Sequence, residues 1–282
     1  MNIDIICPLY KGAKYIKKLH ASILRQKDVN IHSIQYIITN TNDETESIVK
    51  SLDHCSYKII EPSEFSHSLT REKAAYDSDG DIIVFITQDV RIVRDDWLYN
   101  LVKPIEEGDA VLCYSRQLCD NETIEKYTRE SNYPAISHYQ SKEDIPRLGL
   151  KTFFSSDASS AISRQIFEEL NGFDHKRLPT SEDMYMAYKV VMAGYKIKYC
   201  ADSEVIHCHD FNSRDQYHKY VLIGKFFKEN SYLDQYNTTK SGGGMAKYIL
   251  KRAFQDRNWK VLLTFLPNMA GRYLGMKVGK RS

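Results

Sequence analysis

The segment FITQDV, residues 85–90, closes an apolar run with a carboxylate. Asp89 follows a Thr-Gln pair rather than the Gly, Asn or Pro that usually ends a strand. An isolated Asp in this position serves about as often in a turn or a helix cap as in chemistry. The two acids at residues 95–96 are better placed to cap the amphipathic segment WLYNLVKPI, which begins directly after them. Asp89 is therefore a candidate for binding a cation or a substrate.

A second candidate site lies in SEVIHCHDFN, residues 203–212, where two imidazoles end another apolar run. In an extended strand His207 and His209 point to the same face, so both can approach one ion or one phosphate. Cys200 and Cys208 raise the alternative of a structural zinc site. Their spacing is not that of a zinc knuckle and Cys208 would face away from the histidines, so the pattern favours a hard cation or a phosphate.

Two adjacent acids, Glu182 and Asp183, fall in the first turn of a predicted helix. Thr180 or Ser181 would cap this helix and Gly194 would end it. Acids in a first turn favour the positive end of the helix dipole, which is the ordinary explanation of such a pair. A catalytic role is the alternative.

The elements that must position these side chains follow from hydrophobic patterning. Apolar, β-branched runs predict strands at residues 3–7, 34–39, 82–87 and 110–114, and helical patterns at residues 13–26 and 70–76 separate the first three. Strands and helices in alternation predict an α/β fold with a mostly parallel sheet covered on both faces. Ligands bind such sheets at the carboxyl ends of the strands, where Asp89 is expected to lie.

The rest of the chain is less regular. Residues 115–150 are polar and without clear periodicity, and we interpret them as a loop that forms a wall of the substrate cleft. A β-like start runs into a short helix at residues 164–170, and a strand is expected at residues 195–200. Trp97 starts an amphipathic helix and is interpreted as a core residue.

We expect a catalytic domain at residues 1–212 and a helical extension at residues 213–282. The extension contains a helix over 214–233, a break at the SGGG of 241–244 and a basic amphipathic segment over 246–282, which Pro267 should kink. Seven apolar side chains define its expected stripe: Val261, Leu262, Phe265, Leu266, Met269, Tyr273 and Leu274. Such a helix could pack on the domain, join a homodimer or lie on an anionic membrane.

Composition limits the function classes. The 282 residues carry 39 Lys and Arg against 37 Asp and Glu, and a net charge of +2 argues against a nucleic-acid coat. Six scattered cysteines favour a reducing compartment, where they would act as small core residues. No basic segment followed by a long apolar run, and no uncharged apolar stretch of about 18 residues, is found. We therefore expect a cytoplasmic protein with, at most, peripheral contact to the inner membrane face.

The order of CPLYKG, TREKAA, DGDIIVFITQDV, SEDMYMAYKVVMAGYKI and VIHCHDFN resembles the family 2 glycosyltransferases of the GT-A fold, over residues 3 to about 230. Within that family, FSHSLTREKAA, the Thr-Gln-Asp in place of Asp-x-Asp, SRQLCDNETIEKYTRESNYP and the paired histidines look like bacterial rhamnosyltransferases. The resemblance implies a Rossmann-like nucleotide-diphospho-sugar transferase that uses dTDP-L-rhamnose to build cell-surface polysaccharides.

The resemblance also assigns residues. It implies that Asp89, with His209 or less favourably His207, holds Mg²⁺ or Mn²⁺ against the diphosphate leaving group. Asp183 would be the base of an inverting transfer and Glu182 would orient it, giving an α-linked rhamnoside. The expected nucleotide-sugar contacts are Pro8, Tyr10, Asn40, Asn42, Arg71, Gln88, Asp89, Arg116, Gln117 and Asp157.

The acceptor implied is a saccharide or a polyprenyl-diphosphate-linked sugar. Two alternatives stay open. One is a family 2 transferase with a UDP-hexose or UDP-N-acetylglucosamine donor, which a donor panel would reveal. The other is a non-catalytic scaffold of a polysaccharide-assembly complex, which an unaffected Asp183→Asn variant would favour. A metal-dependent nucleotidyltransferase is disfavoured because the sequence has no Gly-rich phosphate loop.

Overall fold

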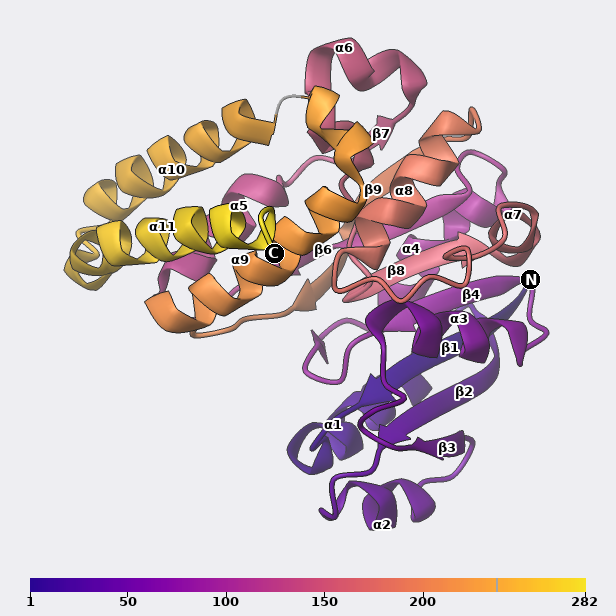
Figure 1. Ribbon diagram of the computed structural model, residues 1–282. Helices are drawn as coiled ribbons and strands as arrows, with labels where there is room; N and C mark the ends of the chain where they lie inside the picture. Colours follow the sequence, from indigo (N-terminus) through magenta and orange to yellow (C-terminus); the bar gives the residue numbers. More distant parts are fainter. Residues whose placement is uncertain (237) are drawn as a thin grey trace.

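The computed structural model describes residues 1–236 and 238–282, and the side chains of residues 238–242 are not described. The described residues form a mixed sheet of nine strands (Figure 1). The strands are β1 (Asn2–Leu9), β2 (Asn30–Thr39), β3 (Ser56–Ile60), β4 (Ile82–Ile86), β5 (Arg91–Ile92), β6 (Leu112–Leu118), β7 (His138–Gln140), β8 (Ser159–Ser163) and β9 (Ile197–Ile206). The expected α/β architecture is confirmed.

The strand order β3-β2-β1-β4-β8-β6-β9-β5 creates a switch point between β1 and β4. Strands β1 to β4 pair in parallel, β6 and β9 are parallel to each other, and β8 runs antiparallel between β4 and β6. The carboxyl ends of β4, β6 and β9 therefore lie at the same edge as the amino end of β8. Ligands of open α/β sheets bind at such an edge.

Helices cover both faces of the sheet. The bounds are α1 (Ala13–Leu24), α2 (Thr45–Lys50), α3 (His67–Tyr76), α4 (Trp97–Glu106), α7 (Arg164–Glu169) and α8 (Glu182–Met192). Helices α1 and α4 bury their apolar stripes in one core, whereas α3, α7 and α8 contribute to a second core on the opposite face. Trp97 is fully buried and its Nε1 donates to the hydroxyls of Ser115 and Ser159, at 3.1 Å each, which confirms it as a core residue.

The expectation of an irregular loop over residues 115–150 was wrong. Strand β6 continues to Leu118, and the segment also contains α5 (Ile124–Asn132), β7, the 3-10 helix η1 (Lys142–Asp144) and α6 (Ile145–Leu148), followed by η2 (Gly149–Phe153). Helix α5 is almost wholly polar. It is stabilised by the Thr123 N-cap and by Ile124 and Tyr127, which pack on apolar residues of the C-terminal helices.

The C-terminal region contains α9 (Ser213–Glu229), η3 (Ser231–Tyr236), α10 (Thr238–Gln255) and α11 (Trp259–Gly279). The predicted break at residues 241–244 was wrong, because α10 runs through them. The chain reverses instead near Arg257, whose φ is +54°, and Asn258 caps α11 by accepting from the amide of Val261 at 3.1 Å. Helix α11 continues past Pro267.

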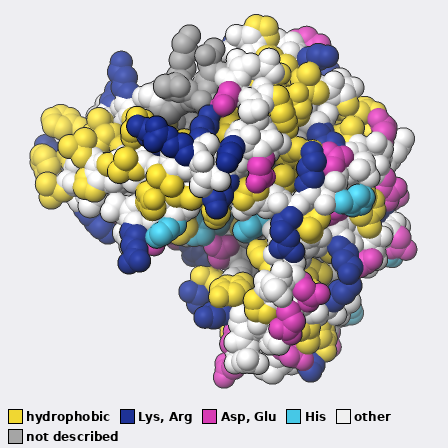
Figure 2. All heavy atoms as spheres, viewed as in Figure 1, with side chains coloured by type: hydrophobic (Ala, Val, Ile, Leu, Met, Phe, Trp, Pro, Cys, Tyr) yellow, Lys and Arg dark blue, Asp and Glu magenta, His cyan; other side chains and the backbone are white. Residues whose placement is uncertain are grey.

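The predicted apolar stripe of α11 is only partly confirmed. Val261 and Phe265 are buried, but Leu266, Tyr273 and Leu274 are exposed. The face that packs on α9 carries Gly271, Gly275 and Gly279 instead. Without Cβ atoms, these residues let the backbones of α11 and α9 approach closely. Figure 2 shows apolar side chains gathered at the end of the molecule where α10 turns into α11 in Figure 1.

The cysteines divide into two kinds. Cys7, Cys113 and Cys200 are buried as expected of small core residues. Cys119 and Cys208, 89 residues apart, form a disulfide that the sequence did not predict, because their proximity depends on β6 and β9 ending side by side. Among the described residues, none of the helices combines the length and the hydropathy needed to cross a bilayer.

Candidate active site

Four strand ends bring the candidate residues to one edge of the sheet. Asp89 follows β4, Gln117 lies near the end of β6, and His207 and His209 follow β9. Asp157 precedes β8 and reaches the same edge because β8 is antiparallel to β4. The backbone amide of Thr87 donates to the carbonyl of Ala158 at 3.2 Å, so the segments that carry Asp89 and Asp157 are directly joined.

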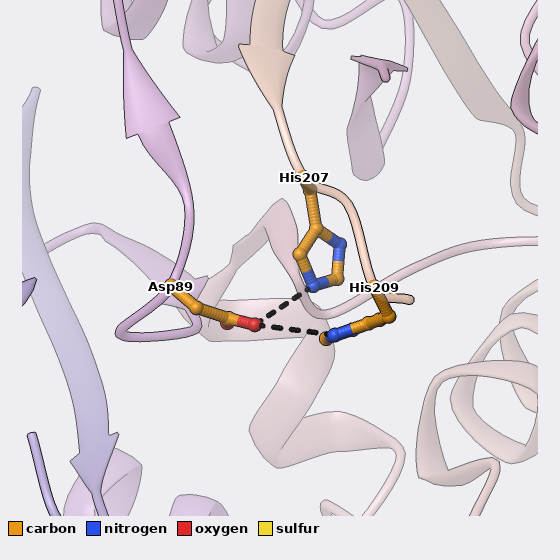
Figure 3. Close-up of side chains that lie close together, drawn as sticks. All are labelled: Asp89, His207 and His209. Carbon is orange, nitrogen blue, oxygen red and sulfur yellow. Dashed lines mark ion pairs between the residues drawn. The ribbon is translucent and has the colours of Figure 1, made fainter. Parts of the chain in front are cut away.

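Asp89, His207 and His209 converge (Figure 3). Oδ2 of Asp89 lies 3.5 Å from Nε2 of His207 and 3.7 Å from Nδ1 of His209. Burial alone would raise the pKa of Asp89, but a hydrogen bond from His207 and electrostatic attraction to the two neighbouring histidines hold this pKa well below its usual range. One carboxylate oxygen and two imidazole nitrogens suit Mn²⁺, and also Mg²⁺ with water and phosphate oxygens added.

Gln117 fixes the orientation of His207. Its Oε1 accepts from Nη1 of Arg129 at 2.6 Å, and an arginine can only donate, so this atom is assigned as oxygen. The same oxygen lies 2.8 Å from Nδ1 of His207, which must then carry a proton. Nε2 of His207 faces Asp89, where a cation could replace its proton. Gln117 also donates to Ser156 at 2.8 Å and is buried, so its polar atoms are engaged within the protein.

The pKa of His209 is lowered to about 4, first by burial and then by the charge of His207. Its ring stacks on Phe211 with centroids 4.7 Å apart. A neutral imidazole held in this way is a ready metal ligand near neutral pH.

A cluster of acids surrounds one arginine. Arg71, on α3, and Glu182, the first residue of α8, are both buried and lie 3.2 Å apart from Nη1 to Oε1. Asp157 is buried, and Ser160 donates to its Oδ1 at 2.6 Å, while its Oδ2 has no hydrogen-bond partner among the described residues. Asp183 accepts from the amide of Met184 at 2.7 Å. Glu182 is thus an ion-pair partner of Arg71.

Two carboxyl groups in this cluster have raised pKa values. The pKa of Asp157 is raised to about 6, mainly by burial and also by Glu182, although Arg71 opposes the shift. The pKa of Asp183 is raised well above its usual range by burial and by the charges of Glu182 and Asp157. Such a carboxylate can accept a proton near neutral pH. Ser181, just before α8, has a φ of +61°, a strained value often found at functional sites.

The predicted nucleotide residues lie at the ends of β1 and β2. Gln88 binds the backbone of Tyr10 through two hydrogen bonds, of 2.9 Å from the Tyr10 amide and 2.8 Å to its carbonyl. Its amide therefore holds the turn after β1, close to Pro8. Asn40 donates to Glu61 at 3.0 Å, and Asn42 has a φ of +52°.

Arg116 is placed apart from these groups, because its Nη1 pairs with Glu204 at 2.8 Å across the β6–β9 pair. Glu72 follows Arg71 on α3 and is also buried. It accepts from the amides of Phe173 and His175, at 2.6 and 3.2 Å, and so holds the loop before α8.

The sequence did not predict which cationic side chains lie near the acid cluster. Arg129 pairs with Glu125 at 3.1 Å, and Lys219 lies on α9. Lys219 is solvent-exposed, but the protein atoms packed around it and the neighbouring Arg129 and Arg272 lower its pKa, while Glu125 and Asp183 oppose the shift. No sequence signal marks Lys219, since α9 reaches the site only through tertiary packing.

A mixed sheet with these two clusters at its carboxyl edge has the architecture of the GT-A fold. Two solved structures share the fold. A mannosyltransferase from Pyrobaculum calidifontis, PcManGT in complex with GDP-Man and Mn²⁺, has a TM-score of 0.65 at 14% identity, covering 99% of this chain and 86% of that chain. TarS 1-349 of S. aureus in complex with UDP has a TM-score of 0.55 at 16% identity, covering 90% and 72%.

Residues 4–171 match the family Glycosyl transferase family 2, and the chain belongs to it. The O-antigen chain rhamnosyltransferase RfbN of Salmonella typhimurium (strain LT2) is 32% identical over 290 residues, covering 99% of this chain and 90% of the relative. The O-antigen chain rhamnosyltransferase WbaN of Salmonella anatum is 32% identical over 291 residues, covering 99% and 89%. The chain is a glycosyltransferase, as its sequence motifs indicated.

Proposed function

We propose that the chain transfers L-rhamnose from dTDP-β-L-rhamnose to a hydroxyl of a lipid-linked or saccharide acceptor in cell-surface polysaccharide synthesis. The two relatives named above are O-antigen chain rhamnosyltransferases, and this chain matches each of them over nearly its whole length. The observation that carries the proposal is that the Asp89 cluster and the acid cluster share one sheet edge, joined through the Thr87–Ala158 hydrogen bond. A donor diphosphate at the first cluster would place its sugar beside the second.

Asp89, His209 and His207 are the proposed ligands of Mg²⁺ or Mn²⁺. A bound cation would neutralise the charge that develops on the departing diphosphate. Gln117 acts on this site as a positioning residue, because its oxygen fixes the tautomer and orientation of His207. Arg71 is the proposed cationic contact to the donor.

Asp183 is the proposed base. It would take the proton of the acceptor hydroxyl as that oxygen attacks the anomeric carbon and dTDP leaves on the opposite side. Inversion of a β-linked donor gives an α-linked rhamnoside. Glu182 contributes charge that raises the pKa of Asp183, while its own oxygen pairs with Arg71.

The nucleotide is proposed to lie at the ends of β1 and β2, against Pro8, Tyr10, Asn40 and Asn42. Gln88 would support this pocket through the backbone of Tyr10. Asp157 is the proposed partner of the sugar hydroxyls, since its Oδ2 has no partner among the described residues. Arg116, paired with Glu204, would have to change partner to contact the sugar.

The end of the α10–α11 hairpin is the proposed contact with the cytoplasmic face of the membrane. Phe254, Trp259, Leu263 and Leu266 are 69, 63, 80 and 74% exposed there. Arg257 and Lys260 lie at the same turn, and no acid follows Asp256 in the sequence. An anionic lipid surface matches apolar and cationic side chains together. A symmetric dimer through this face would bring like charges toward each other, which makes a homodimer the less favoured alternative.

A thermal-shift series tests the donor assignment. Purified protein is melted with dTDP, UDP, GDP and their sugar conjugates, each with Mn²⁺, Mg²⁺ or EDTA. A ligand that binds only the native state raises the melting temperature. We expect metal-dependent stabilisation by dTDP and dTDP-rhamnose. Stabilisation by UDP-sugars alone would overturn the assignment of dTDP-rhamnose as donor. If no nucleotide stabilises the protein, a non-catalytic scaffold is favoured instead.

A further inference from the structure

An apolar groove opens beside the acid cluster, between α8, α9, η2 and the C-terminal helices. Its volume is about 660 Å³, within the range of small-molecule sites. Phe154, Ile223, Phe227, Met269 and Met276 form much of its wall. Methionine-rich walls adapt to flexible apolar ligands.

One end of the groove lies next to the segment that carries the proposed base. Met184, which follows Asp183, and Asn132, which precedes Tyr133, both line it. The ring of Tyr133 lies close enough to Asp183 for the charge of this carboxylate to act on its pKa, which burial chiefly raises. A molecule lying in the groove would therefore end where the acceptor hydroxyl must be.

The charge of the groove is positive. Lys151, Arg272, Lys277 and Lys280 line it, and its described lining contains no Asp or Glu. Lys280 is paired with Asp234 at 2.5 Å outside this lining. The remaining cations have no ion-pair partner among the described residues.

Arg272 is the most informative of these residues. It is only 6% exposed. Its Nε donates to Asn268 at 2.9 Å and its guanidinium lies over the ring of Tyr220, 5.6 Å from the centroid. No carboxylate of the described residues lies within ion-pair distance, and residues 237–242 contain no Asp or Glu. The buried carboxylate of Glu125 acts on Arg272 only at longer range. A buried cation without an anion in direct contact is costly, which suggests that a ligand supplies the missing contact.

We infer that this groove binds the lipid part of the acceptor, with the first isoprene units against its apolar wall and the diphosphate at Arg272. The inference rests on the proposed function, from which it takes the acceptor class, and it adds the binding site and the residue that recognises the diphosphate. The cationic lining selects an anionic amphiphile over a neutral apolar ligand.

The test uses isothermal titration calorimetry of the full chain with farnesyl diphosphate, inorganic diphosphate and farnesol, in saturating dTDP to occupy the donor site. Farnesyl diphosphate is expected to bind at least about tenfold more tightly than either fragment. Arg272→Gln should weaken the binding of both farnesyl diphosphate and inorganic diphosphate about tenfold or more. Met276→Gln should weaken only farnesyl diphosphate, by about fivefold.

Lys260→Gln removes a charge from the same helix outside the groove and should change each affinity less than about twofold. Circular dichroism and dTDP binding verify that each variant is folded, and Met276→Gln keeps the test decisive if Arg272→Gln misfolds. Equal affinities for farnesyl and inorganic diphosphate, or binding unchanged in folded Arg272→Gln, would overturn the inference. Rhamnose transfer without prenyl diphosphate binding would overturn it while leaving the proposed function intact.

Discussion

At the scale of single residues, the surroundings of Asp183 destabilise its ionised form, and the same effect would make it a stronger base in the proposed reaction. Its raised pKa means that the native state holds this proton to a higher pH than the unfolded chain does. The ionised form is therefore destabilising at neutral pH, and stability is lost as pH rises from the unfolded pKa to the folded one. The base of a transfer reaction gains from this arrangement because a stronger base accepts a proton more readily.

Asp183→Asn should stabilise the protein and abolish its activity. The amide stays neutral and can still accept from the Met184 amide, so we expect a gain of about 1–3 kcal/mol at pH 7.5, or about 3–8 °C in Tm. Transfer should fall about 10²- to 10⁴-fold. Calorimetry at pH 7.5 and pH 5 measures the gain, which should shrink at the lower pH. Asp202→Asn, at an exposed acid, is the control, and a destabilised Asp183→Asn protein would contradict the account.

The pH dependence of kcat should have an acidic limb well above the pKa of an ordinary carboxyl group, because Asp183 must be ionised to act. Asp157 helps to raise the pKa of Asp183. Asp157→Asn should therefore move this limb to lower pH, even where KM also rises. The kcat of the wild type and of the Asp157→Asn variant, measured at pH values from 4.5 to 8, gives the shift of this limb. A limb that stays in place would show that the charge of Asp157 does not reach the base.

The sequence located much of this site but not its connections. The resemblance to the family 2 glycosyltransferases placed Asp89 with His209, and less favourably His207, at one cation site, and the structure brings both histidines within 4 Å of Asp89. Gln117 was predicted to contact the nucleotide-sugar substrate, yet its hydrogen-bond partners Ser156 and His207 lie 39 and 90 residues away in the sequence. Contacts of this kind depend on sheet order, which local patterns do not contain.

At the scale of elements, the glycine face of α11 determines how α9 and α11 pack. A Cβ at Gly275 would press on the carbonyl oxygen of Tyr217, whereas one at Gly244 in α10 would meet no atom within 4 Å. Gly275→Ala should destabilise the protein by about 1–3 kcal/mol through overpacking. Gly244→Ala should stabilise it by up to about 1 kcal/mol, as alanine does in helices. Urea unfolding compares the pair, and equal effects would contradict close packing.

The strands were easier to predict than the helices that cover them. Strands β1, β2, β4 and β6 come from long apolar runs, and their positions were right within a few residues. Helix α5 was missed because its polar sequence carries no stripe wide enough to predict burial. Its partners Ile249, Ala253, Val261 and Phe265 lie more than 100 residues further along the chain.

At the scale of the whole molecule, charge substitutions at the α10–α11 end test the proposed contact with the membrane. Leu263→Glu with Leu266→Glu should reduce binding to vesicles of anionic phosphatidylglycerol at least about tenfold, because both side chains would insert. Flotation assays measure this binding, with neutral phosphatidylcholine vesicles as reference. High salt should also weaken it.

Glu substitutions at Tyr57 and Ile59, exposed on edge strand β3, provide the matched control and should leave vesicle binding unchanged. Wild-type protein that binds neither vesicle type, but forms a dimer that the Leu263 and Leu266 changes dissociate, would assign this face to self-association instead.

We propose above that a cation held through Asp89 assists transfer from dTDP-rhamnose. The most direct measurement is the rate of dTDP release from dTDP-L-rhamnose, with a prenyl-diphosphate-linked saccharide acceptor, as Mn²⁺ is titrated. Asp89→Asn is compared with Asp79→Asn, which alters the other group of acids and histidine that could hold an ion. We predict a saturable, Mn²⁺-dependent rate in wild type and Asp79→Asn that falls at least about 100-fold in Asp89→Asn. Full activity in EDTA, or an Asp89→Asn enzyme equal to wild type, would contradict the account.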